Sequence, residues 1–440
     1  MPIEVQRREL DAKLIVATVA AGRGFKTIIG RDQMVRRMAA YLPKGILFDK
    51  SIEGNRDSKV SRYHRLGYRI TAMDEEGTGF LMAPEAFMRT RLANKTLNKT
   101  SRWFCINEAV REICVEEFPD HQEKFVTTGL GRTDTWRKQF QGLFEKEAKA
   151  IRAKVGKFIL FNSNFATVNH ARGEAFVLKQ MKRTQALDKT TAEDDEKLLR
   201  ENTANLVAYT ELLPKLLEWF PEHTLVIRPH PGEYLPYWTD RFGDNNRVVF
   251  SSGGVVTPWI LASDIVLHHG CTTGVEAELM EQAQINYAPI PDEHHDGEIP
   301  RAFSHFVYNE KDLHSVMAEM LSGTNNYRKQ RAGLERWFAC LDGTLVAEKV
   351  VDEFDKLRFS ARDLSPLLPL ARLLPRNLVA RFKNLSSRSR AYSAQKFEGM
   401  SAEMLNAKLE VIAGALGQER PPRARQIFDE LYMVESDPHA

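Results

Sequence analysis

The sequence predicts an α/β fold made of two similar halves, each a mostly parallel sheet with helices on both faces. Short apolar runs typical of buried strands alternate with helix-like segments, and the series begins anew beyond residue 157. The chain has 440 residues, which is too long for a single hydrophobic core of ordinary size. Two domains of about 150 to 200 residues each are therefore expected, together with extensions.

In the first half, five strand-like runs are separated by helix-like segments. The helix-like segments include residues 9–21, 32–41 and 108–118. The strand-like runs are 26–29, 45–48, 68–73, 103–106 and 124–127. Sequential strand and helix units of this kind form parallel sheets, whose ligands bind at the carboxyl ends of the strands.

The second half begins after a polar helical stretch at 135–154. Its strand-like runs are 158–161, 224–227, 247–250, 264–267 and 284–287. Residues 171–220 have a mostly helical pattern, with a charged surface segment at 192–197, and helical signals over 310–357 close this half. We expect domains at 1–150 and 151–357 facing each other across a cleft, followed by a basic helical extension at 358–440.

Composition limits the class of protein. A hydrophobic content of 43% and a charged content of 28% are ordinary for a globular protein and argue against a fibrous or disordered chain. The four cysteines lack the spacing of a disulfide framework or a structural zinc site, which favours the reducing cytoplasm. No apolar run approaches the roughly 18 residues of a membrane span, and no signal peptide is evident.

Two short segments point to an anion site. Residues 228–233 (Arg-Pro-His-Pro-Gly-Glu) follow one buried strand, and residues 268–276 (His-His-Gly-Cys-Thr-Thr-Gly-Val-Glu) follow another and open a helix. Unpaired N–H groups and the positive end of a helix favour a phosphate, Thr272 and Thr273 can donate further hydrogen bonds, and Arg228 with His230 can supply charge. The simpler alternative is a rigid turn and a helix cap.

Other polar residues lie near these strand ends. Glu276 can accept hydrogen bonds from ribose hydroxyls, although an acid in a first helical turn is also favoured by the dipole alone. Asn162 and Asn164 end the strand at 158–161 and can face a nucleotide or simply form a turn. His268 and His269 are either phosphate ligands or hydrogen-bonded core residues.

An acidic cluster follows the strand at 68–73. Asp74, Glu75 and Glu76 are adjacent, and Gly77 follows them. Neighbouring carboxylates repel one another, so at least one should have a raised pKa unless cations are near, which is one way to make a general base. A flexible acidic turn is the alternative.

These motifs resemble those of the GT-B glycosyltransferases that use CMP-activated sugars, namely bacterial sialyltransferases, polysialyltransferases and Kdo transferases. The chain from residue 3 to about residue 321 more closely resembles the bacterial surface carbohydrate biosynthesis protein family. Segment 128–132 departs from that family's usual TGNPR. The matching segments are Arg8-Glu9-Leu10-Asp11, Phe48-Asp49-Lys50-Ser51, Asp74-Glu75-Glu76-Gly77, Asn162-Ser163-Asn164-Phe165, Asn169-His170, Arg228-Pro229-His230-Pro231 and Gly270-Cys271-Thr272-Thr273-Gly274.

The resemblance implies a GT-B fold of two Rossmann-like domains, the first binding the acceptor and the second the nucleotide sugar. It implies that Glu75 is the base, with Glu76 or Asp74 as the assisting acid. No metal or cofactor is expected, since no His, Asp and Glu set has ligand spacing and His294-His295-Asp296 has the character of a surface loop. The resemblance implies that His230, Thr272 and Thr273 bind the CMP phosphate. The full set of expected donor-binding residues is Arg228, His230, Pro231, Gly270, Thr272, Thr273, Gly274, Glu276, Asn162 and Asn164.

The extension is basic and apolar. Between Arg358 and Arg390, eight basic residues accompany one acid, Asp363, and leucines are interspersed with them. This pattern favours docking of 358–390 on an anionic membrane surface, so a cytoplasmic protein peripheral to the inner face of the membrane is one expectation. A helix packed on the body of the protein is the other. Nucleic acid is not expected, because aromatic residues do not interleave the basic ones.

The resulting hypothesis is a metal-independent transfer of a Kdo-like or nonulosonic sugar from CMP to a cell-surface glycan or glycolipid acceptor. Two rivals remain open from the sequence. One is a CDP-glycerol-type phosphotransferase or a nucleotide-sugar epimerase, and the other is a non-catalytic sugar-nucleotide-binding assembly protein.

Overall fold

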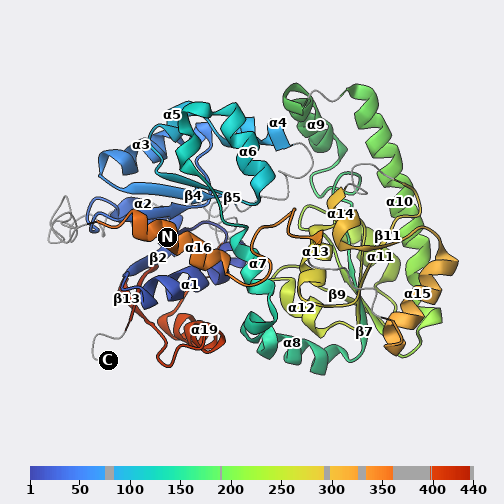
Figure 1. The fold of residues 1–440 in the computed structure, drawn as a ribbon. Coiled ribbons are helices and arrows are strands. Elements are labelled where there is room, and N and C mark those ends of the chain that lie inside the picture. Colours follow the sequence, from blue (N-terminus) through green and yellow to red (C-terminus); the bar gives the residue numbers. More distant parts are fainter. Residues whose placement is uncertain are drawn as a thin grey trace. The chain divides into compact units, whose positions relative to one another are not determined.

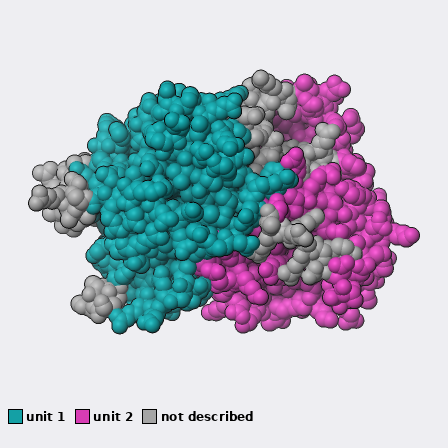
Figure 2. All heavy atoms as spheres, in the orientation of Figure 1, with its two compact units in different colours: residues 1–80, 87–135, 335–440 teal, residues 81–86, 136–334 magenta. Residues whose placement is uncertain are grey.

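A computed structural model of the chain describes residues 1–74, 84–188, 191–291, 298–325, 333–359, 397 and 399–436. The chain forms two compact units, coloured teal and magenta in Figure 2. Unit 1 comprises residues 1–80, 87–135 and 335–440, and unit 2 comprises residues 81–86 and 136–334. The chain therefore divides at points other than the expected boundaries at 150 and 357, because residues beyond 334 return to the first unit.

Unit 1 contains a parallel sheet with the strand order β3-β4-β5-β6. Its strands are β3 (Ile46–Asp49), β4 (Arg69–Met73), β5 (Arg102–Cys105) and β6 (Phe125–Thr127). The helices and 3-10 turns of this region are η1 (Gly54–Arg56), α3 (Asp57–Arg65), α4 (Pro84–Arg91), α5 (Asn94–Leu97), α6 (Glu108–Glu117), η3 (Pro119–Lys124) and α7 (Gly131–Trp136).

A second sheet in unit 1 joins the two ends of the described chain, in the order β1-β2-β14-β13. Strand β1 (Pro2–Ile3) pairs in parallel with β2 (Thr27–Arg31), and β14 (Leu431–Glu435) pairs antiparallel with both β2 and β13 (Arg423–Phe428). The C-terminal part thus differs from the expected helical extension. The apolar run 431–434, with Leu431, Tyr432 and Val434 buried, forms a strand, while α19 (Ala402–Ala415) is helical. The basic segment 360–396 lies outside the described residues.

Helix α1 (Gln6–Gly22) lies at the centre of unit 1. It is buried from Glu9 to Ala21 with one residue, Asp11, as an exception, and it packs against α16 (Val346–Lys356) and α19. Its two buried charges neutralise each other, since Lys13 Nζ lies 2.7 Å from a Glu9 carboxylate oxygen. Helix α2 (Asp32–Met38) covers β1 and β2. The segment that contains α16 is therefore an integral part of unit 1.

Unit 2 is built on a six-stranded parallel sheet. Its strands are β7 (Phe158–Asn162), β8 (Thr224–Arg228), β9 (Val248–Phe250), β10 (Ile265–His268), β11 (Gln284–Tyr287) and β12 (His305–Val307). They lie in the order β9-β8-β7-β10-β11-β12. Numbered within the unit, this is the order 3-2-1-4-5-6 of the Rossmann fold, and the order reverses between β7 and β10.

Helices cover both faces of this sheet (Figure 1). On one face, alternate strand residues such as Phe161 and Leu267 form a core with α10 and α15. On the other side lie α8, α12 and α13. The remaining elements of the unit and their bounds are η4 (Lys138–Phe140), α8 (Gly142–Val155), α9 (Glu174–Asp188), α10 (Ala192–Trp219), α11 (Pro236–Phe242), α12 (Thr257–Ala262), α13 (Thr272–Leu279), α14 (Glu298–Phe303) and α15 (Glu310–Ser322).

The predicted α/β class with two Rossmann-like units is confirmed. Every strand-like run expected in the two halves overlaps a strand of the structure, from β2 to β11. Strands β1, β12, β13 and β14 were not expected. Within the described part of the chain, no helix has both the length and the apolar character needed to cross a membrane.

A tight contact between β2 and β14 provides a test of the second sheet of unit 1. A Cβ added at Gly30 would overlap the Glu430 carbonyl oxygen and the Leu431 side chain. We expect Gly30→Ala to destabilise unit 1 by about 1 to 3 kcal/mol, the usual cost of overpacking. Chemical denaturation measures this loss. Gly45→Ala is the matched control, because a Cβ there meets no atom within 4 Å, and equal stabilities of the two variants would contradict the pairing.

Candidate functional site

Four polar residues form a row at the carboxyl edge of the unit 2 sheet. Asn162 on β7 lies opposite Arg228 on β8 and opposite His268 on β10, and His268 lies opposite Asn286 on β11. Their strand neighbours belong to the apolar core shared with α10, so alternation directs this row to the other face. The strands thus present polar groups where the sheet meets α12 and α13.

The row crosses the point where the strand order reverses, between β7 and β10. At such a point the two connecting loops leave on opposite faces and open a crevice, which is where open α/β sheets bind their ligands. The loop after β7 carries Ser163 and Asn164, and the loop after β10 carries Gly270 and Cys271. Of the two segments that suggested an anion site, residues 228–233 follow β8 and residues 268–276 follow β10, and these two strands flank β7.

Arg228 is bound to the loop that follows β9. Its guanidinium donates to Ser251 Oγ at 2.8 Å and to the carbonyl oxygens of Gly253 and Gly254 at 2.5 and 2.8 Å. These contacts join the end of β8 to the loop after β9 and order that loop. Arg228 thus combines a structural task with a charge at the site edge.

His230 is exposed just beyond β8. Its Nδ1 accepts a hydrogen bond from the Gly232 backbone N–H at 3.1 Å. A neutral imidazole whose Nδ1 is an acceptor carries its proton on Nε2. The turn therefore sets the tautomer in which Nε2 is a donor, as a phosphate requires. Pro231 is also exposed and lies within this turn.

Glu233 is a buried carboxylate to which the sequence analysis assigned no role. It accepts hydrogen bonds from Ser163 Oγ at 2.7 and 2.8 Å, from the Phe165 N–H at 3.0 Å, from the His230 N–H at 3.1 Å and from Trp238 Nε1 at 2.9 Å. The side chain is 6% exposed. Neutral donors compensate this charge, and they tie the loop after β7 to the loop after β8. The only sequence signal was an acid two residues after a His-Pro turn.

The N-terminus of α13 offers backbone donors. Gly270 has a left-handed φ of 52°, and its N–H donates to Asn286 Oδ1 at 3.0 Å, which turns the chain sharply after β10. Thr272 and Thr273 are the first residues of the helix, and their N–H groups have no helical acceptor. The Thr272 side chain is exposed. The helix end therefore has the donors that the sequence analysis expected.

His268 and Gly274 pack against each other inside unit 2. The imidazole Nε2 lies 3.0 Å from Gln284 Oε1 and 3.2 Å from Ser304 Oγ, and the side chain is fully buried. Burial lowers the pKa of His268 to about 4. A Cβ at Gly274 would overlap this ring. His268 is thus a neutral core residue, which agrees with the simpler of its two expected roles, and Gly274 is required for packing.

Glu276 is buried beside the start of α12. Its carboxylate accepts a hydrogen bond from the Thr257 hydroxyl, and only 2% of the residue is exposed. Burial raises the pKa of the neighbouring Cys271 thiol, and the charges of Glu233 and Glu276 add to this effect. Both carboxylates are thus within electrostatic range of the N-cap of α13.

Two asparagines have buried amide groups without partners. The Nδ2 atoms of Asn162 and Asn286 find no acceptor among the described residues, although the residues are only 3% and 0% exposed. An unsatisfied buried donor costs about 1 to 3 kcal/mol, so such groups commonly pair with a ligand or an ordered water. Asn164 differs, because its Nδ2 donates to the His269 carbonyl oxygen at 3.3 Å.

In unit 1, Asp74 follows β4 and is buried beside a cation. Arg91 Nε lies 3.6 Å from Asp74 Oδ2, and the same guanidinium also pairs with Glu53. The contact places a cation beside the end of β4. Glu75, Glu76 and Gly77 lie outside the described residues.

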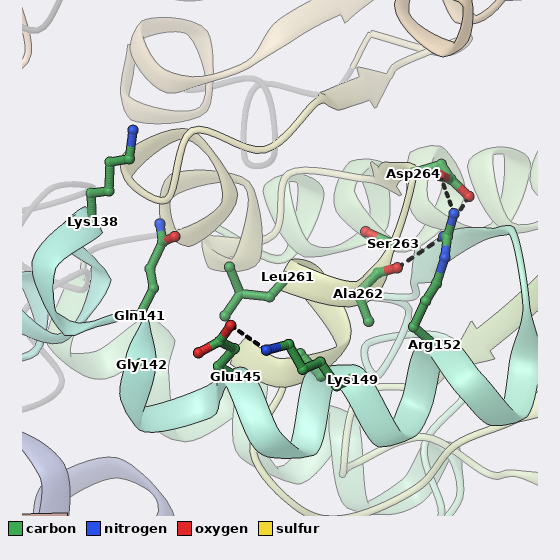
Figure 3. A pocket seen from close by; sticks show the side chains of 11 residues that line it. Lys138, Gln141, Gly142, Glu145, Lys149, Arg152, Leu261, Ala262, Ser263 and Asp264 are labelled. Atoms are coloured by element: carbon green, nitrogen blue, oxygen red, sulfur yellow. Dashed lines mark hydrogen bonds and ion pairs between the residues drawn. The ribbon is translucent and has the colours of Figure 1, made fainter. Parts of the chain in front are cut away.

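The hollow drawn in Figure 3 lies at the opposite end of the sheet. It is lined by residues of α8 and α12 and by Asp264, which precedes β10. Arg152 binds both Asp264 carboxylate oxygens at 2.8 and 2.9 Å, and Asp264 also accepts from the Phe158 N–H. These contacts join the amino ends of β7 and β10. The hollow therefore lies away from the polar row.

No cluster of three or more His, Cys, Asp or Glu residues suited to hold a metal occurs among the residues described. The segment His294-His295-Asp296 falls outside them.

Comparisons with known proteins give structural resemblances. No family model matches the chain, and no curated protein matches it. UDP-GlcNAc 2-epimerase from Methanocaldococcus jannaschii is similar at 13% identity and a TM-score of 0.46, over 79% of this chain and 82% of that one. The Neisseria meningitidis UDP-GlcNAc 2-epimerase bound to UDP-GlcNAc is similar at 10% identity and a TM-score of 0.43, over 80% of this chain and 81% of that one. The wall teichoic acid polymerase TagF is similar at 11% identity and a TM-score of 0.38, over 80% of this chain and 93% of that one.

The buried His268 makes the stability of the protein depend on pH. The unfolded state takes up the proton near pH 6.5 and the folded state only near pH 4, so falling pH favours unfolding between these values. The loss amounts to about 3 kcal/mol across this range. We expect His268→Gln to flatten the pH dependence of the denaturation midpoint between pH 6.5 and 4. The exposed His314→Gln is the control, and identical pH dependence in both variants would contradict the burial of a neutral His268.

Proposed function

We propose that this protein is a metal-independent glycosyltransferase that moves a Kdo-like or nonulosonic sugar from CMP to a surface glycan or glycolipid. The observation that carries the proposal is the polar row at the switch point between β7 and β10. It lies beside a helix N-terminus and a histidine whose Nε2 is set as a donor. This combination suits the phosphate of a nucleotide.

The phosphate-binding groups have complementary tasks. The N–H groups and hydroxyls of Thr272 and Thr273 donate to phosphate oxygens at the positive end of α13, and the Nε2 of His230 donates from the loop after β8. Asn162 Nδ2 lies buried between them in the row. Such fixed donors act without reorganisation when charge develops on the leaving CMP.

The rest of the nucleotide has two candidate partners. Glu276, whose carboxylate accepts a hydrogen bond from Thr257, is proposed to bind the ribose hydroxyls. Arg228, Gly253 and Gly254 fix the loop after β9, which leads into α12 beside Glu276. That ordered loop is the proposed boundary of the nucleoside site.

The chemical step requires a base for the acceptor hydroxyl. We assign this role to Glu75, assisted by Glu76, because Asp74 is buried and paired with Arg91. Asp74 is the alternative assisting acid in this proposal, and its contact with Arg91 fixes its position at the end of β4. The acceptor-binding role of the region before residue 150 is part of the same proposal, as is membrane docking through 358–390.

Loss of the His230 donor should slow the reaction strongly. Removing one preorganised donor at a developing charge typically costs about 100-fold to 1000-fold in rate. We expect His230→Ala to lose turnover to this extent with an unchanged denaturation midpoint, measured by CMP release. His314→Ala, which alters an exposed histidine on α15, is the control. Near-normal turnover of His230→Ala would overturn the phosphate site.

The donor class is tested by which nucleotide is released. Incubation with a CMP-sugar, CDP-glycerol and a UDP-sugar should release CMP alone. Release of CMP from CDP-glycerol would favour the phosphotransferase alternative, release of UDP would favour a transferase of another class, and conversion of the UDP-sugar into its epimer would favour an epimerase. Glu75→Gln and Glu76→Gln should bind CMP normally by calorimetry but lose turnover. Full turnover in both variants would contradict the base assignment.

A further inference from the structure

A second histidine lies beside His230, on the loop that follows β7. Its backbone belongs to a short antiparallel pairing between the two loops, in which the Ala171 N–H donates to Gly232 O and the Tyr234 N–H donates to Asn169 O, both at 2.8 Å. His170 and Glu233 form the bridge between these bonds. The position of His170 relative to His230 is therefore fixed by backbone contacts as well as by the Glu233 carboxylate.

The two imidazoles are held in the same way. His170 Nδ1 accepts from the Arg172 N–H at 2.9 Å, as His230 Nδ1 accepts from the Gly232 N–H at 3.1 Å. In each case the donor lies two residues along the chain. In the neutral form both rings therefore carry their proton on Nε2, the tautomer that donates outward from the turn.

Gly232 separates the two rings. A Cβ placed there would lie 3.3 Å from His230 Nδ1 and 3.6 Å from His170 Nε2. The same Cβ would lie 3.3 Å from Ala166 Cβ, so Gly232 is closely surrounded by the side chains of both loops. His170 is half-buried against Phe176, with ring centroids 4.7 Å apart, so its orientation is restricted on the other side as well.

We propose that His170 is a second phosphate-binding histidine, whose Nε2 donates together with that of His230 to the phosphate of the nucleotide. This inference rests on the proposed function, because it assigns a further ligand to the same phosphate. The two side chains come from paired loops, so together they can give one phosphate two hydrogen bonds from groups whose backbone positions are fixed.

Two substitutions of His170 separate ligand binding from loop support. The amide of Asn places an acceptor near the position of Nδ1, so His170→Asn keeps the bond from the Arg172 N–H but removes the Nε2 donor. The longer Gln places its amide near the position of Nε2, so His170→Gln keeps a donor and loses the bond to Arg172. A purely structural role predicts that Asn is tolerated better, and a phosphate-binding role predicts the reverse.

The measurement is calorimetric titration with CMP and with cytidine, and in parallel with UDP and uridine. His170→Asn should weaken nucleotide binding about 10-fold to 100-fold, as expected for a hydrogen bond to a charged group, and leave nucleoside binding unchanged. His170→Gln should retain most of the nucleotide affinity. His230→Asn serves as the positive control and His314→Asn as the negative control.

The outcomes distinguish this inference from the proposed function. If His230→Asn weakens nucleotide binding while His170→Asn does not, or if Asn is tolerated better than Gln at 170, the role of His170 is overturned and the phosphate site stands. If the unmodified protein binds CMP and UDP no more tightly than their nucleosides, the phosphate site itself is overturned. Tighter binding of UDP than CMP would replace the proposed donor nucleotide and leave the test of His170 valid.

Discussion

A carboxylate withdrawn from water is costly unless donors surround it, and Glu233 meets this condition with donors from three segments. They are the Ser163 hydroxyl and Phe165 N–H after β7, the His230 N–H after β8 and the Trp238 indole on α11. The first three bonds join the carboxylate to loops that leave the sheet at its carboxyl edge, and the bond from Trp238 joins it to α11. The geometry of the His230 turn and the pairing of the two loops both depend on this one buried group.

The architecture was largely accessible from sequence because strand runs such as 158–161 and 264–267 are continuous apolar segments. The order of the strands could not be predicted, because β10 lies beside β7 through contacts between residues more than 100 positions apart in the sequence. The return of the chain to unit 1 was also missed. Phe354 packs its ring 5.7 Å from that of Phe48, and no local pattern in either segment reveals such a long-range contact.

Local features were predicted where residue type determines them, as with the helix that starts at Thr272 and the turn at His230, while their phosphate-binding role stays a prediction. Other features were missed where partners decide the role of a residue. Gly274 is a residue type typical of phosphate-binding loops, yet in the structure its missing Cβ makes room for the buried His268 ring. Glu233 follows a proline and a glycine, as acids in surface turns often do, yet it is only 6% exposed. Hydrogen-bond partners from distant segments distinguish these cases, and a single sequence does not display them.

The pairing of β2 with β14 has a consequence for biosynthesis. Almost all of unit 2 is one continuous stretch, so it can fold while the chain is still attached to the ribosome. Strand β2 is made early, but its neighbour β14 is made about 400 residues later. At translation rates of roughly 5 to 20 residues per second, β2 keeps an open edge for tens of seconds. The second sheet of unit 1 is therefore completed only after nearly the whole chain has been synthesised.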